Sequence, residues 1–220
     1  TQWNAPEGAK LTASSPVTLS WDNGAGLLFT RTISIDENYM FSVAQSVKNS
    51  SGQSVRLYPY GLITRNGTPA TAGFYILHEG LIGVFGDEGL SEVKYDDLVE
   101  DGEIRPSKVD QGWLGITDKY WAATLIPTPG SSFQPRFSYA QATDNFQADF
   151  LGDAVEVASG ATGETASYLF AGAKQKHLLD GYEQTIGVQK FNLLIDWGWF
   201  YFLTKPMFFV IDWLFKVVGN

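Results

Sequence analysis

The sequence of 220 residues has no cysteine and only two histidines. Without cysteine the chain forms no disulfide, and it offers no thiolate as a nucleophile or metal ligand. Basic side chains are also scarce, because 15 Lys and Arg stand against 24 Asp and Glu, which gives a net charge of −9. Recognition of nucleic acid needs a basic face that meets phosphate, so this class of partner is excluded.

The composition is that of a folded chain. Hydrophobic residues make up 44% and aromatic residues 15%, whereas charged residues make up only 18%, the reverse of a disordered composition. At this length an all-β chain can remain one domain that buries roughly 70% of its unfolded surface. The chain starts at Thr1 rather than at Met, so we expect a processed product or a fragment.

Short alternating apolar runs, separated by turn residues, fill residues 15–173. Asn23-Gly24 lies between the runs 17–21 and 27–35 and predicts a hairpin, since both residues tolerate positive φ. We predict a second hairpin around Asn49–Gly52. Further strands are predicted at 74–77, 81–85, 92–95, 113–117, 120–126, 136–140, 147–151, 155–158 and 167–171. Helix signals appear only late, first at 174–181, a short helix that we expect Gly181 to end.

This pattern predicts a mostly β, antiparallel sandwich. The predicted body spans residues 1–190, and a different kind of segment follows at 191–220. That tail carries ten of the 32 aromatic residues, and its two acidic and two basic side chains cancel, so the whole charge of −9 belongs to the body. Pro206 fits the first turn of a helix at 206–218, which would be about 20 Å long. This is too short to cross the ~30 Å core of a bilayer.

The tail nevertheless has the pattern of a membrane-surface helix. Lys205, Asp212 and Lys216 share one face of a helix, and large apolar residues occupy the other faces. We therefore favour an amphipathic, interfacial helical linker that leads into a transmembrane helix over a terminal helix packed on the body. The residues predicted to contact the membrane interface are Trp197, Trp199, Phe200, Tyr201, Phe202, Lys205, Pro206, Met207, Phe208 and Trp213.

The body gives weak signals for catalysis. His78 and His177 are 99 positions apart and share no motif. The carboxylate clusters, such as Glu100–Glu103, are most simply solvated turns, although a glycosidase-like pair from two different strands stays open. No Gly-x-Ser-x-Gly motif is present, and the Gly-rich stretch 80–89 does not precede a helix. We predict no catalytic residue, no cofactor and no metal ligand.

The densest cluster of large side chains lies at Trp113–Trp121. Alternation places Trp113, Gly115 and Thr117 on one face of a strand, with Leu114 and Ile116 on the other. Core packing is favoured for this cluster over an exposed aromatic surface that would bind sugars.

Two segments carry a resemblance to a known family. The segment 112–127, Gly-Trp-Leu-Gly-Ile-Thr-Asp-Lys-Tyr-Trp-Ala-Ala-Thr-Leu-Ile-Pro, resembles the signature of the periplasmic domain of bacterial YidC-type membrane protein insertases. The segment 196–207 resembles the junction between that domain and an interfacial helix. The segments 49–52 and 172–174 match the same family more weakly. The resemblance leads us to expect Pro at position 173, where this chain has Ala. The family-signature residues, expected to be structural, are Trp113, Gly115, Asp118, Lys119, Tyr120 and Trp121.

The resemblance implies a galactose-mutarotase-like β-supersandwich, followed by C-terminal interfacial helices. It implies a periplasmic location in a Gram-negative bacterium, anchored to the inner membrane by a multi-pass parent protein. The implied role is docking and positioning, without enzyme activity, in an insertase that works with the Sec translocon. The implied partners are SecDF and the Sec translocon, the bilayer surface, and nascent inner-membrane proteins, which the family's absent membrane core would handle.

Two other functions stay open. A carbohydrate-binding or mutarotase-like domain would need a histidine acid and a glutamate base that converge on one concave face. The candidates are His78, His177, Glu79, Glu92 and Glu183, and we predict that they do not converge. A peptide-binding chaperone surface would instead need an exposed sheet edge or an apolar groove.

Overall fold

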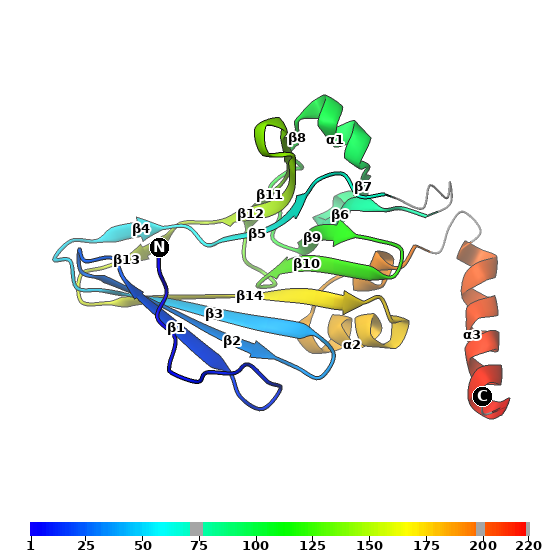
Figure 1. The fold of residues 1–220 in the computed structure, drawn as a ribbon, viewed down its shortest axis with the longest axis horizontal. Helices are drawn as coiled ribbons and strands as arrows, with labels where there is room; N and C mark the ends of the chain where they lie inside the picture. Colours follow the sequence, from blue (N-terminus) through cyan, green and yellow to red (C-terminus); the bar gives the residue numbers. More distant parts are fainter. Residues whose placement is uncertain (71–76, 197–200, 219–220) are drawn as a thin grey trace.

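The computed structural model describes residues 1–70, 77–196 and 201–218, and it is dominated by two antiparallel sheets (Figure 1). The larger sheet has eight strands in the order β1 (Val17–Asp22), β2 (Leu27–Ile35), β3 (Met40–Asn49), β14 (Thr162–Ala173), β10 (Trp121–Pro127), β9 (Gly112–Thr117), β6 (Gly80–Phe85) and β7 (Gly89–Val93). The smaller sheet has four, in the order β5 (Tyr60–Asn66), β12 (Asn145–Gly152), β11 (Phe133–Ala140) and β8 (Glu103–Ile104). These sheets confirm the predicted antiparallel sandwich.

The remaining elements are short apart from two helices. A separate ribbon pairs β4 (Val55–Leu57) with β13 (Val155–Val157). The α-helices are α1 (Tyr95–Asp101), α2 (Lys176–Ile186) and α3 (Tyr201–Val218). Single turns of 3₁₀-helix lie at Gly86–Glu88, Gln141–Thr143 and Phe191–Leu194.

Two hydrophobic cores lie on opposite faces of the larger sheet, and strand β9 contributes to both. Leu114 and Ile116 belong to the core that also holds Phe137 and Phe146 of the smaller sheet. Trp113 belongs to the core that α2 covers from the other side, together with Met40, Ile82, Phe170, Leu179 and Phe191. The predicted alternation of Trp113 against Leu114 and Ile116 is therefore confirmed, and five of the six residues of β9 are buried because both of its faces are covered.

The second predicted hairpin is wrong. Strand β3 pairs with β2 and β14, whereas β4 pairs with β13. Buried Asn49 explains the change of partner, because its side-chain amide donates to the carbonyl oxygens of Gln53 and Val157, 2.7 and 2.8 Å away. These bonds attach the turn to β13, which lies 108 positions later in the chain.

The helices also differ from the prediction. Helix α1 was missed, although Asp96 and Asp97 stand in its first turn and Gly102, with φ +72°, caps its end through a bond to Leu98. Helix α2 passes through Gly181 and ends before Gly187, whose φ is +79°. Gly181 was mistaken for the end because Gly weakens a helix interior without forbidding it.

The α-helix of the tail, α3, runs through Pro206. We predicted that Pro206 would open a new helix, but α3 already begins at Tyr201. Pro206 is the sixth residue of α3, beyond the four N–H groups that have no partner in the helix, so its missing N–H removes one intrahelical hydrogen bond, at a cost of about 3 kcal/mol. Among the described residues, no helix is both long and apolar enough to cross a membrane.

The predicted division at residue 190 stays a prediction. Phe191 and Leu194 are fully buried in the core under α2. We therefore propose that the packed body extends a few residues further, to about Asp196.

Candidate functional site: the junction of the body with the terminal helix

Trp113 anchors the root of the tail. Its indole is completely buried, its ring N–H donates to the carbonyl of Gln189 at 3.2 Å, and its ring meets Phe191 edge-on at 5.4 Å. Gly115 follows on the same strand, where a Cβ would lie 2.0 Å from the carbonyl oxygen of Ala123. These two signature residues therefore bring β9, β10 and the start of the tail together.

Lys174, directly after β14, is the charged centre of the junction. Its ammonium donates to the hydroxyl of Thr117 at 3.0 Å. Burial lowers the pKa of Lys174, and nearby carboxylates oppose this shift; the largest of these opposing effects comes from Asp196, followed by Asp118, Glu79 and Glu92. Lys174 thus lies within the field of an aspartate from each of the two family segments, Asp118 and Asp196.

Asp118 and Asp196 each hold a further part of the body. The carboxylate of Asp118 accepts from Arg65 of β5 at 2.7 Å, and this guanidinium lies 5.9 Å from the ring of Tyr95 at the start of α1. Asp196 accepts the backbone N–H of His78 at 3.0 Å. The last residue before the undescribed segment 197–200 is therefore tied to the loop that precedes β6.

Exposed aromatic side chains gather at this end of the larger sheet. Tyr120 and Trp121, at the β9–β10 turn, are 65% and 60% exposed, and the Lys119 ammonium lies 5.0 Å from the Tyr120 ring centroid. Tyr39, at the neighbouring β2–β3 turn, is also exposed. Figure 1 shows these two turns at the end of the sheet nearest α3. Sequence reasoning placed Tyr120 and Trp121 in a mainly buried cluster, and it missed Tyr39.

The backbone at Tyr39 is strained, with φ at +68°. The turn is held by Asp36, whose carboxylate accepts the N–H groups of Asn38 and Met40, both at 2.8 Å. The hydroxyl of Tyr182 in α2 donates a hydrogen bond to the same carboxylate at 2.6 Å. The pKa of Tyr182 is raised, mainly because the side chain is buried and secondly because of this hydrogen bond. Helix α2 therefore fixes the turn that displays Tyr39.

Helix α3 exposes apolar side chains over a wide arc. At 100° per residue, its exposed apolar residues span ~200° of the helix circumference. They are Met207, Val210, Ile211, Trp213, Leu214, Phe215, Val217 and Val218. Pro206 is exposed as well.

Part of the predicted membrane-interface set is not described. Trp197, Trp199 and Phe200 lie outside the described residues. Tyr201, Phe202, Lys205 and Phe208 lie on α3, but their side chains are outside the described part.

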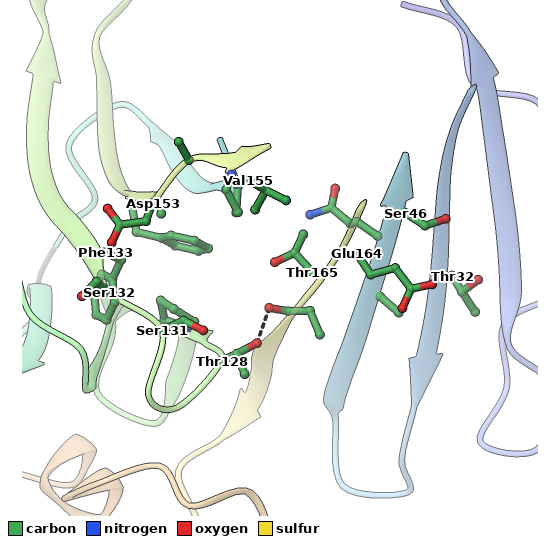
Figure 2. Close-up of a pocket in the computed structure, with 18 of the residues that line it drawn as sticks. Thr32, Ser46, Thr128, Ser131, Ser132, Phe133, Asp153, Val155, Glu164 and Thr165 are labelled. Carbon is green, nitrogen blue, oxygen red and sulfur yellow. Dashed lines mark hydrogen bonds between the residues drawn. The ribbon is translucent and has the colours of Figure 1, made fainter. Parts of the chain in front are cut away.

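The body also has a cleft of about 720 Å³ at the other end of the sandwich (Figure 2). No described residue in its lining is a histidine, and its lining carboxylates are Asp153 and Glu164. His177 is exposed on α2, and the ring nitrogen Nε2 of His78 lies 2.8 Å from the carbonyl oxygen of Leu81. The carboxylate of Glu183 accepts the N–H of Asn192 at 2.8 Å. Among the described residues, the lining of the cleft therefore holds no histidine–glutamate pair of the kind that a mutarotase-like site needs.

We expect the burial of Lys174 to show in the pH dependence of stability. Its pKa is lowered on folding, so at alkaline pH the unfolded chain binds more protons than the folded one. The contribution of Lys174 to the unfolding free energy should therefore rise with pH, from the folded pKa up to the unfolded value of about 10.4. Denaturant unfolding of the wild type and of Lys174→Met at alkaline pH measures this difference. A difference that stays flat or falls would contradict the assignment.

The body has the galactose-mutarotase-like fold. A galactose mutarotase related enzyme from Lactobacillus acidophilus matches with a TM-score of 0.54 at 11% identity, covering 78% of this chain and 71% of that one. A galactose mutarotase-like protein from Lactobacillus casei matches with a TM-score of 0.51 at 10% identity, covering 77% and 72%. At such low identity the likeness defines the fold class and nothing about activity.

Sequence comparison defines the family. Residues 1–210 match the family described as the YidC periplasmic domain. Proteins named membrane protein insertase YidC from Rhizobium johnstonii and Sinorhizobium medicae are 52% and 49% identical over the whole chain. The chain belongs to the YidC periplasmic domain family, whose named relatives are insertases and not enzymes. It spans 37% of the length of each of these relatives.

Proposed function

We propose that this periplasmic domain positions a membrane insertase by setting α3 in the periplasmic leaflet of the inner membrane. The observation that carries the proposal is the exposed apolar arc of α3. An arc of ~200° is wider than the seam by which a surface helix packs on a core, and it suits a helix half-sunk at the level of the lipid headgroups. The sequence supplies the opposite face with Lys205, Asp212 and Lys216.

The junction supports the same orientation. Tyr39, Tyr120 and Trp121 are exposed at the end of the body from which the tail leaves, and Tyr and Trp favour the membrane–water boundary. The root of the tail is held to the body by the buried side chains of Phe191 and Leu194 and by the hydrogen bond from the N–H of His78 to Asp196. A rigid root transmits the position of the body to α3.

We further propose that the body docks SecDF and so keeps the insertase near the Sec translocon. The support is membership of the YidC periplasmic domain family, whose named relatives are membrane protein insertases. Because the chain spans only 37% of the length of its relative from Rhizobium johnstonii, we assign the insertion of nascent inner-membrane proteins to the remainder of the parent protein. We place the present chain in the periplasm, attached to the inner membrane through the parent protein.

Vesicle binding tests the role of α3. The chain should float with vesicles of phosphatidylethanolamine and phosphatidylglycerol. The triple variant Ile211→Ser, Trp213→Ser, Leu214→Ser should bind at least about a thousandfold more weakly, because each side chain contributes roughly 1.5–3 kcal/mol when buried and every 1.4 kcal/mol is tenfold in affinity. A matched control replaces Tyr58, Leu62 and Leu151, which are exposed on the body, with serine and should bind normally. Equal binding of both variants would overturn the proposal.

Docking to SecDF is tested separately. Affinity-tagged chain should retain SecDF from detergent-solubilised inner membranes, and the α3 triple variant should retain it equally well, since docking is assigned to the body. Failure of both proteins to retain SecDF would contradict the docking role and leave the lipid-binding role intact.

A further inference from the structure

Strand β14 extends beyond the end of β10, one of its two neighbours in the larger sheet. It pairs with β3 from Met40–Phe170 as far as Lys48–Thr162. On its other side, pairing with β10 stops at Pro127–Ser167. The segment Thr162–Ala166 therefore pairs with β3 on one side and has no paired strand on the other, although β14 is a central strand of the larger sheet.

The backbone groups of this segment alternate between the two sides, as in any antiparallel strand. On the β3 side, the carbonyl oxygen of Ala161 accepts the N–H of Asn49, and the N–H of Ala171 donates to the carbonyl oxygen of Tyr39. On the β10 side, the N–H of Lys174 donates to the carbonyl oxygen of Tyr120, and the carbonyl oxygen of Ala166 accepts from the hydroxyl of Thr128. The N–H and C=O groups of Thr162 and Glu164 therefore point to the vacant side, where no strand of the described residues pairs with them.

This vacant side opens on the cleft of about 720 Å³. Residues 164–166 line one wall, and Ser131, Ser132 and the segment 153–155 line the other. In Figure 2, Thr165 points across the cleft towards Val155, whereas Glu164 and Ser46 extend to the opposite face of the sheet. A Cβ on Gly163 would lie 2.5 Å from Val157, so β13 covers the face of β14 there and leaves its edge open.

We propose that this slot binds an extended segment of another polypeptide chain, which adds a strand to β14 beyond the end of β10. Such β-augmentation draws affinity from main-chain hydrogen bonds and specificity from alternate side chains. Residues 162–166 offer ~17 Å of strand, enough for a segment of about five residues. The site goes beyond the proposed lipid contact and does not depend on it.

The slot also defines the side chains of its ligand. A residue opposite Glu164 lies on the same face of the sheet, so a lysine or arginine there pairs with the exposed carboxylate. The next residue faces Thr165 inside the cleft and is small. A sugar fits less well: Phe133 and Phe150 are only 1% and 4% exposed, which leaves no ring face for stacking, and Asp153 is already ion-paired with Lys108.

Amide hydrogen exchange of the chain without ligand tests the free edge. The N–H groups of Thr162 and Glu164 should exchange fast, and those of Gly163 and Thr165 should be protected by β3. Adding an acetylated hexapeptide in which lysine alternates with serine should slow exchange at Thr162 and Glu164. Uniform protection along 162–166 in the free chain would show that the edge is already covered and would overturn the proposal.

Variants at Glu164 test the main-chain contact. The substitution Glu164→Pro removes the edge N–H without touching the β3 ladder, since this group points away from β3. Peptide affinity should fall at least about tenfold, as expected for the loss of one or more main-chain bonds. Glu164→Ala keeps the N–H and should lose only the part of the affinity that depends on salt.

A modified peptide completes the design. The same hexapeptide, N-methylated at alternate amides on its pairing edge, should fail to bind the wild type. Circular dichroism melting of Glu164→Pro verifies that the variant is folded. Equal binding of the hexapeptide to folded Glu164→Pro and to the wild type would overturn the proposal.

Discussion

Replacing Trp113 with alanine should lower the free energy of unfolding by about 3–5 kcal/mol, the range observed when a large buried aromatic is truncated. The indole is completely buried between the larger sheet and the residues that follow α2. Its removal leaves a cavity, an unpaired carbonyl at Gln189 and one less ring against Phe191. Because Phe191 belongs to the root of the tail, the lost contact should also loosen residues 191–196.

The companion variant Trp121→Ala is the control for this prediction. Trp121 is 60% exposed on the neighbouring strand, so its loss should change the unfolding free energy by less than about 1 kcal/mol. Guanidinium unfolding measures both variants, and amide exchange at residues 191–195 reports the loosening in Trp113→Ala alone. Equal destabilisation by the two substitutions would contradict the burial pattern.

These two tryptophans show how far the sequence predicts the structure. Alternation in 113–117 predicts two opposite faces, and the chain indeed buries both. Alternation does not say where a sheet ends, so the exposure of Tyr120 and Trp121 at the turn was not predicted. The mostly β architecture follows from the spacing of turn residues, because local backbone preferences determine it.

Long-range pairing was beyond local reasoning. The sequence around Asn49 predicts a turn correctly, but the pairing of β3 with β14 depends on residues more than a hundred positions away. The junction has the same origin: Asp118 and Asp196 stand in two recognisable segments, and only the fold places both near Lys174. The open edge of β14 was equally hidden, because it exists only where β10 ends.

Gly115→Ala should be among the most damaging single substitutions in the chain. The added Cβ would lie 2.0 Å from the carbonyl oxygen of Ala123 and 2.7 Å from the Cα of Thr124. Both contacts are with the backbone of β10, which is fixed by pairing with β9 on one side and β14 on the other. Relief therefore requires the central strands to separate, and we expect a loss of at least about 3 kcal/mol, the upper range for overpacked cores.

Gly181→Ala is the matched control, with the same chemical change and the opposite sign. Gly181 lies inside α2, and a Cβ there meets nothing within 4 Å. Since alanine restricts the unfolded chain and favours the helix, this substitution should raise the unfolding free energy by about 0.5–1 kcal/mol. Thermal melts of the two variants side by side should move in opposite directions from the wild type. A melting temperature of Gly115→Ala at or above that of the wild type would mean that β9 and β10 do not pack as closely as described.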